Sequence, residues 1–135
     1  MIGLVLIAHG KLASELVSIM EHIVGRQEYI ETVSIGPDDD VEKRREEIIQ
    51  KTTAVDQGKG VILLTDMFGG TPSNLAISTM AKSKVEVVAG VNLPMLIKLT
   101  SIRGFKSLEE TAAQATESGR KHINVASYIL RLGKD

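Results

Sequence analysis

The sequence contains no cysteine and no tryptophan, and it has only two phenylalanines and two tyrosines. Without cysteine there is no disulfide, no thiolate ligand for a metal and no cysteine nucleophile. Any chemistry must therefore use histidine, aspartate, serine, threonine or lysine. The shortage of aromatic rings leaves little stacking surface for a flavin or an exposed base, which argues against a flavodoxin.

Charge of one sign and long apolar runs are also scarce. The 16 Lys and Arg residues against 17 Asp and Glu residues give a net charge of −1, which argues against nucleic acid as a partner because its phosphates attract basic proteins. The apolar run Ile2–Ala8 is too short to span a bilayer, and no basic segment precedes it as in a signal peptide. We therefore expect a cytoplasmic protein.

The order of apolar residues predicts alternating strands and helices within one domain, residues 1–135. Ile2–Ala8 and Gly60–Thr65 are almost wholly apolar, as in strands buried on both faces of a parallel sheet. Tyr29–Ile35 alternates and is expected nearer an edge, and Val85–Ala89 is the fourth strand. Helices are predicted from Leu12 to the terminator Gly25, from Val41 to about Thr53, from Thr71 through Met80 and Ala81, from Leu93 to about Ser101, and from Ser107 to about Ser118.

Several residues predict where these helices begin, end and face. Thr71 is expected as an N-cap with Pro72 at the first helical position, and Ser107 to Glu110 is a capping box. Gly119 is expected to end the last helix. In the first helix, apolar residues recur at the helical spacing, with Leu16, Ile19 and Ile23 as the predicted core-facing stripe; the full set is Leu12, Leu16, Ile19, Met20 and Ile23.

This alternation is typical of an α/β fold with a single doubly wound, mostly parallel open sheet flanked by helices. Four strands are expected to be parallel, and Ile123–Ser127 is a candidate for a short fifth strand. On a monomer that strand and the apolar residues Tyr128–Leu130 would leave an exposed sheet edge and an apolar tail. We therefore expect a homodimer in which a second subunit covers them.

Two unusual turns follow the first and third strands, at the edge where such sheets place their sites. His9 and Gly10 end the first strand, and Asp66 opens the turn after the third. Because these two strands are commonly neighbours, His9 and Asp66 are expected to touch. A carboxylate bonded to one imidazole nitrogen leaves the other as a directed nucleophile, which is the minimum needed for a phosphohistidine.

The same turns carry features suited to phosphate. Gly10 lets the chain pass close to a ligand, and Gly69 and Gly70 lead into a helix start with free backbone N–H groups. Thr71 adds a hydroxyl beside them. A tight strand-to-helix turn explains the glycine pair equally well, and Lys11 either adds positive charge or is simply solvated.

The other titratable groups have simpler explanations. His22 and His122 are expected at the surface, and Asp38–Asp40 is expected to form a turn and a helix cap instead of a cation site. The run Lys43–Glu47 has the neighbouring opposite charges of a solvated helix face. We therefore predict no metal site and no cofactor.

Three stretches resemble a known family across almost the whole chain: LVLIAHG (Leu4–Gly10), ILLTDMFGGTPSN (Ile62–Asn74) and VVAGVNLPMLIKL (Val87–Leu99). The sequence resembles the IIA component of the mannose/fructose/sorbose class of the bacterial sugar phosphotransferase system. The second stretch is the most specific, because Asp followed by aromatic-Gly-Gly-Ser/Thr-Pro is particular to this class.

The resemblance implies that His9 is the phosphorylated histidine, that Asp66 orients it and that Thr71 lies beside the phosphate. It also implies that HPr donates the phosphoryl group and a IIB protein accepts it, without metal or nucleotide, and that the membrane is reached only through IIC and IID components. Because the sequence stops at Asp135, the IIB partner is expected to be a separate chain. Relatives of this class are dimers in which the last strand crosses to the partner's sheet, antiparallel to its neighbours. A role as a regulatory sensor of phosphorylation state is equally compatible.

Three alternatives compete with this interpretation. The phosphotransferase-linked subunit of dihydroxyacetone kinase has a similar fold, but its second turn resembles Asp-Met-Gly-Ser, unlike Asp66–Pro72 here. A sirohydrochlorin-type metal chelatase also ends its first strand in His-Gly, but it needs a second histidine at another strand end. A receiver domain requires a phosphorylated aspartate where this sequence has His9.

Overall fold

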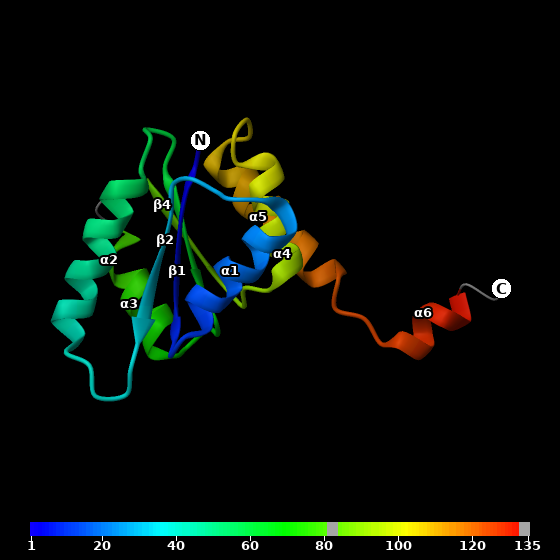
Figure 1. The fold of residues 1–135 in the computed structure, drawn as a ribbon, viewed down its shortest axis with the longest axis horizontal. Helices are drawn as coiled ribbons and strands as arrows, with labels where there is room; N and C mark the ends of the chain where they lie inside the picture. The colour runs from blue at the N-terminus through cyan, green and yellow to red at the C-terminus, as the bar shows by residue number, and fades with distance from the viewer. Residues whose placement is uncertain (81–83, 133–135) are drawn as a thin grey trace.

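The fold is an open parallel sheet with helices on both faces (Figure 1). The computed structural model describes residues 1–80 and 84–132. The strands lie in the order β2-β1-β3-β4, all parallel, so β2 is at an edge as expected. Their bounds are β1 Gly3–His9, β2 Ile30–Ile35, β3 Val61–Thr65 and β4 Val85–Ala89.

Helices cover the two faces of the sheet in separate layers (Figure 1). One layer consists of α2 and α3, and the other of α1, α4 and α5. The α/β class predicted from the sequence is therefore confirmed. The helices are α1 Leu12–Val24, α2 Val41–Val55, α3 Thr71–Ser78, α4 Leu93–Ile102, α5 Leu108–Lys121 and α6 Ala126–Leu132.

The central pair β1 and β3 is buried on both faces, which explains their nearly continuous apolar sequences. Leu4 and Leu6 contribute to the core under α1, α4 and α5, whereas Val5 and Ile7 contribute to the core under α2 and α3. Ile7 pairs with Thr65 in the parallel register. The residues that follow these two strands therefore leave the sheet side by side.

Most of the predicted helix ends are confirmed. Gly25 ends α1 with a φ of 91°, a conformation that favours glycine. The Asp40 carboxylate accepts hydrogen bonds from the backbone N–H groups of Glu42 and Lys43. The Ser107 hydroxyl likewise accepts from the N–H of Glu110.

The structure corrects the prediction that Thr71 is the N-cap of α3. The N-cap is Gly70, whose extended backbone precedes the helix and whose carbonyl accepts the first helical hydrogen bond, from Asn74. Thr71 is the first helical residue, with Pro72 after it. The helix ends at Ser78, and the predicted helical residue Ala81 lies outside the described residues.

Gly119 was wrongly predicted as a terminator, because α5 continues through it to Lys121. A Cβ at Gly119 would lie 2.9 Å from the methyl carbon of Met95 and 3.3 Å from the side-chain oxygen of Asn92. The Asn92 side chain also donates to the carbonyl of Gly119. This glycine therefore permits close packing of α5 against the start of α4.

The buried face of α1 differs in part from the prediction, which included Met20 among the apolar positions but not Ala13. Ala13 and Met20 are buried, while the predicted core residues Ile19 and Ile23 are 45% and 56% exposed. Leu16 is only partly buried. The small side chain of Ala13 fits against the sheet, so the helix turns the face centred on positions 13 and 20 inward and leaves the neighbouring stripe in solvent.

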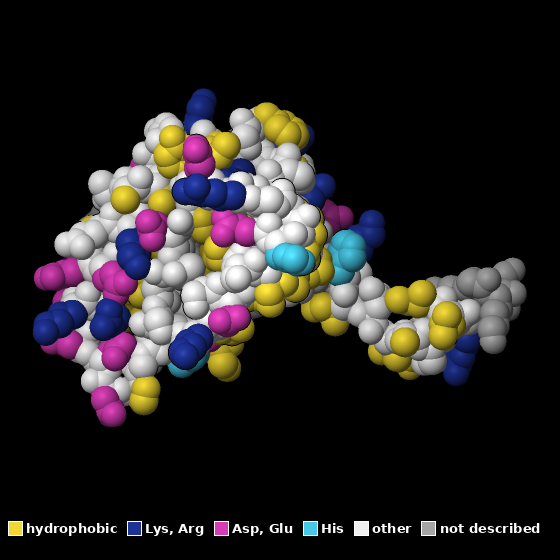
Figure 2. All heavy atoms as spheres, viewed as in Figure 1, with side chains coloured by type: hydrophobic (Ala, Val, Ile, Leu, Met, Phe, Trp, Pro, Cys, Tyr) yellow, Lys and Arg dark blue, Asp and Glu magenta, His cyan; other side chains and the backbone are white. Residues whose placement is uncertain are grey.

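The predicted fifth strand at Ile123–Ser127 is not formed. Residues 123–125 are irregular, and α6 begins at Ala126 on a segment that extends away from the sheet (Figure 1). The backbone N–H groups of Tyr128 and Ile129 donate to the nearby carbonyl of Val125, because a single chain brings no strand alongside to pair with this segment. The apolar side chains along it stay exposed (Figure 2).

The homodimer remains a prediction, and these exposed side chains give it a direct test. A second copy that covers Ile123, Tyr128 and Leu130, which are 60–74% exposed here, would remove a large apolar surface from water. We expect light scattering to give a dimer mass for the intact chain and a monomer or aggregate after deletion of residues 124–135. His9→Ala should leave association unchanged, and a monomer mass for the intact chain would contradict the prediction.

Candidate functional site

His9 and Asp66 meet at the edge of the sheet where β1 and β3 end. Nδ1 of His9 lies 2.7 Å from Oδ2 of Asp66, and the same oxygen accepts the His9 backbone N–H at 2.9 Å. The other carboxylate oxygen accepts the N–H of Met67. The Asp66 side chain is 13% exposed and the His9 side chain 52%. The predicted contact is therefore confirmed, with a fixed carboxylate beneath an accessible ring.

The electrostatics of this pair define which nitrogen is reactive. Partial burial disfavours the ionised form of Asp66, but the hydrogen bonds and charge of His9 and the N–H of Met67 together hold the pKa of that carboxyl below its usual value. An ionised carboxylate only accepts hydrogen bonds, so Nδ1 of His9 carries a proton in the charged ring and keeps it in the neutral ring, the form with a nucleophilic nitrogen. The lone pair is then on Nε2.

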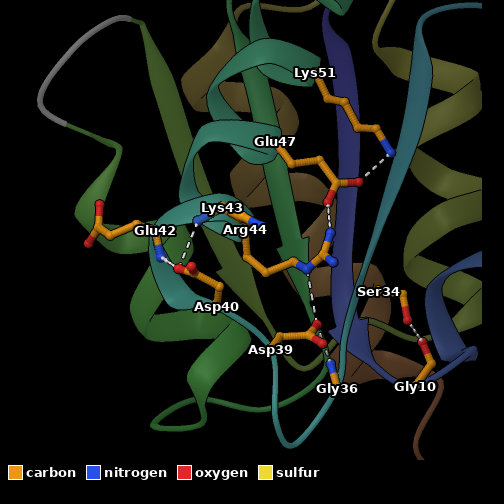
Figure 3. A network of polar contacts seen from close by, with 10 residues as sticks. All are labelled: Gly10, Ser34, Gly36, Asp39, Asp40, Glu42, Lys43, Arg44, Glu47 and Lys51. Atoms are coloured by element: carbon orange, nitrogen blue, oxygen red, sulfur yellow. Dashed lines mark hydrogen bonds and ion pairs between the residues drawn. The ribbon is translucent and has the colours of Figure 1, made fainter.

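The three predicted glycines near His9 have different structural roles. Gly10 and Gly69 have φ values of 56° and 89°, and both face open space, so their backbone conformations explain them. A Cβ at Gly70 would lie 3.3 Å from Cε1 of His9. Gly70 therefore leaves room beside the imidazole. The Ser34 hydroxyl holds the carbonyl of Gly10 against β2 (Figure 3).

A cavity of about 320 Å³ opens beside His9. Thr71 lines it together with His9, as expected for a residue near a bound group. The other polar contributors are Asp39 and Arg44, which come from the β2–α2 turn and the first part of α2. The cavity therefore lies between the residues that follow β1 and β3 and a third segment, residues 36–44, for which the sequence predicted only a turn, a helix cap and a solvated helix face.

Arg44 lines this cavity, although the charge pattern of residues 43–47 predicts a solvated helix face. Its Nε donates to Oδ2 of Asp39 at 3.0 Å, and its Nη1 donates to Glu47, which also pairs with Lys51 at 2.9 Å (Figure 3). Asp39 in turn accepts the N–H of Gly36 at 2.8 Å. This network ties the cavity wall to α2.

The periodicity of α2 could have revealed Arg44. Positions 44, 47 and 51 follow the helical repeat alongside the buried residues Ile48, Thr52 and Val55. The hydrogen bond to Glu47 raises the pKa of Arg44 against the effect of partial desolvation. The Gly36 N–H, with Arg44, keeps the pKa of Asp39 below its usual value. The cavity thus holds a fixed ion pair.

The remaining candidates are not among the residues that line this cavity. Asp40 caps α2, as the turn interpretation predicted. His22 and His122 are exposed, as is Lys11, which precedes α1. Among residues 1–80 and 84–132, no group of three or more His, Cys, Asp or Glu side chains is arranged to hold a metal ion. Over the same residues, no helix has the length and apolar character to cross a membrane.

The family assignment rests on a match over most of the chain. Residues 3–116 match the profile of the family described as PTS system fructose IIA component. The chain belongs to this family. The IIA fold is also found in component EIIA of the phosphotransferase system from Streptococcus agalactiae, whose crystal structure has a TM-score of 0.87 and 26% identity, covering 95% of this chain and 99% of that one.

Two sequence relatives extend the comparison. The chain is 34% identical over 124 residues to the PTS system mannose-specific EIIAB component of Escherichia coli K12, covering 90% of this chain but 38% of that protein. It is 27% identical over 131 residues to the PTS system fructose-specific EIIA component of Bacillus subtilis, covering 96% of this chain and 90% of that one. The chain thus spans well under half of the mannose-specific relative.

Proposed function

We propose that this IIA chain carries a phosphoryl group on Nε2 of His9, taken from HPr and passed to a IIB protein. The observation that carries the proposal is the 2.7 Å contact between Nδ1 of His9 and Asp66, which leaves Nε2 unprotonated beside an open cavity. Family membership adds the sugar phosphotransferase system as the setting. A regulatory role that senses phosphorylation state would use the same chemistry.

The transfer needs only the groups present. The lone pair of Nε2 attacks the phosphorus of the HPr phosphohistidine, a new N–P bond forms, and the old N–P bond breaks with its electron pair returning to the imidazole of HPr. Positive charge develops on the His9 ring as it bonds to phosphorus. The ionised Asp66, bonded to Nδ1–H, stabilises that charge.

The start of α3 supplies donors for the phosphoryl oxygens. The backbone N–H groups of Thr71 and Ser73 lie in the first helical turn and have no partner within the helix, while Pro72 has no N–H to offer. The Thr71 hydroxyl lines the same cavity as His9. These donors favour the phosphorylated state without a metal ion.

The surface around His9 suits a protein partner. Met67 and Phe68, which follow Asp66, are 58% and 77% exposed. Leu12, shortly after Gly10, is 44% exposed, and Val41, at the start of α2, is 47% exposed. Exposed apolar groups around an accessible reactive atom are typical of a docking surface. We assign this surface to HPr and to the IIB protein in turn, because HPr must bring its phosphohistidine, and the IIB protein its acceptor group, to the same nitrogen.

Phosphorylation at His9 is the direct test of the proposed function. Incubation with enzyme I, HPr and phosphoenolpyruvate should add one acid-labile, alkali-stable phosphoryl group per chain, detected by intact-mass spectrometry. His9→Ala should abolish the label, whereas His22→Ala, at an exposed histidine, should retain it. Full labelling of His9→Ala would exclude the proposed acceptor.

Asp66→Asn should separate orientation from folding. The amide cannot hold the Nδ1–H tautomer as a carboxylate does, so we expect phosphoryl transfer to slow by about 10² to 10⁴-fold. Nitrogen NMR of His9 should show loss of the single tautomer while the remaining spectrum stays that of the folded chain. An unchanged single-turnover rate would remove Asp66 from the mechanism.

Arg44 is the cation of the cavity, and we assign it to stabilising the phosphoryl group on His9. Its Nη2 makes no hydrogen bond to the described residues, so it is available to a phosphate oxygen while Nε and Nη1 keep Asp39 and Glu47. Arg45 is the matched control, because its guanidinium pairs with Glu42 and Ser78 and does not line the cavity.

Arg44→Ala should therefore lower the rate of His9 phosphorylation by about tenfold or more, measured by rapid-quench labelling with HPr in excess. Arg44→Lys should recover part of the rate, since it restores the charge without the planar fork. Arg45→Ala should behave as wild type. Equal rates for the Arg44→Ala and Arg45→Ala variants would show that Arg44 only holds the turn before α2.

A further inference from the structure

A second cavity lies at the end of the sheet opposite His9, where the strands begin. It has a volume of about 250 Å³ and is formed where β3 and β4 begin and where α4 leads into α5. In Figure 1 this end of the sheet is the one beside the N-terminus, away from the arrowheads of β1 and β2. Four of its lining side chains are cationic, Lys59, Lys84, Arg103 and Lys106, and none is acidic.

Arg103 is the unusual member of this group because it is 2% exposed. Its guanidinium donates to the backbone carbonyls of Ile2, Glu28 and Tyr29 and to the side-chain oxygen of Gln27, all of which are neutral acceptors. Its Nε–H has no acceptor among the described residues. A buried guanidinium without a carboxylate is costly, and burial lowers the pKa of Arg103 accordingly.

The start of α5 offers backbone N–H donors to the cavity, and its first turn also carries Glu109 and Glu110. Ser107 is the N-cap, and its hydroxyl is bonded to the N–H of Glu110. The N–H groups of Leu108 and Glu109 are the first two of a 14-residue helix and have no partner within it. Because Ser107 and Leu108 line the cavity, the positive end of the helix dipole opens onto it.

The carboxylates nearest along the chain, Asp56, Glu86, Glu109 and Glu110, do not line the cavity. Glu110 contacts the Ser107 hydroxyl, and Asp56 accepts the N–H groups of Gly58 and Gly60. Lys106 extends over the ring of Phe105, 5.7 Å from its centroid. The positive charge around the cavity is therefore not balanced by a side chain that lines it.

We propose that this cavity binds a small anion bearing a phosphate group, with Lys59, Lys84 and the first turn of α5 as its donors and the cationic Arg103 as a further lining residue. The cavity has room for a phosphate or a short phosphate ester and not for a nucleotide, since most sites for larger ligands are bigger. The site is separate from the His9 cavity and does not depend on phosphoryl transfer.

Binding should also stabilise the fold. Arg103 links the start of β1 to the segment 27–29 before β2 and lies at the end of α4. An anion that compensates its charge binds only the folded chain, so the melting temperature should rise with ligand concentration. The free chain and the phosphorylated chain should bind it alike.

The test is a titration of the full ¹⁵N-labelled chain with inorganic phosphate and, separately, with glycerol 3-phosphate, at ionic strength held constant with sodium chloride. We expect saturable shifts of the Ser107 and Leu108 amide signals. The double variant Lys59→Ala/Lys84→Ala should weaken the affinity by about tenfold or more. Lys43→Ala, at an exposed lysine on α2 that does not line the cavity, is the control for the loss of positive charge and should bind as wild type.

His9→Ala serves to separate the two cavities, and it should leave the shifts at Ser107 and Leu108 unchanged. Tighter binding of the ester than of phosphate would identify a phosphorylated metabolite as the ligand, and the reverse would identify free phosphate. The proposal is overturned if these amides show no saturable shift, or if the double variant and Lys43→Ala bind equally well.

Discussion

The parallel pairing of β1 with β3 is the constraint on which the rest of the structure depends. Both strands are buried on both faces, so a slip of one residue would exchange the two halves of the core and is strongly disfavoured. The pairing of Ile7 with Thr65 brings His9 and Asp66 out of the sheet together. The geometry of the proposed phosphorylation site at the surface is thus set by apolar packing beneath it.

The strands, the parallel sheet and the His9–Asp66 contact were predictable from the sequence because each has a local signal. Continuous apolar runs identify buried strands, and polar residues at their ends meet wherever parallel strands are neighbours. The polar N-cap residues of the helices were predicted correctly in some helices and not in others. Asp40 and Ser107 do cap their helices, but α3 has Gly70 as its N-cap instead of Thr71. A Cβ at Gly70 would lie 3.3 Å from the His9 ring, a contact that no pattern within the helix predicts.

The errors share a cause, which is that the deciding contacts are distant in the sequence. Gly119 continues a helix because Met95 and Asn92 press against it, and no pattern within α5 indicates this. Ile19 and Ile23 looked like core residues by periodicity, but the sheet accepts the face of Ala13 and Met20. The segment 123–127 has strand-like residues, yet a strand requires a neighbour, and without one the chain turns into α6.

The two edges of the sheet treat charge in opposite ways. At the carboxyl edge Arg44 has carboxylate partners on both sides, Asp39 and Glu47, and Asp66 has His9. Charges there are paired yet accessible, an arrangement that suits the proposed arrival and departure of a phosphoryl group. At the amino edge Arg103 is buried among carbonyl oxygens. Carbonyl dipoles solvate a guanidinium but do not neutralise its charge. The positive charge of Arg103 therefore adds to that of the lysines that line the same cavity. The same sheet therefore carries the proposed site of phosphoryl transfer at one end of its strands and the proposed site of anion binding at the other.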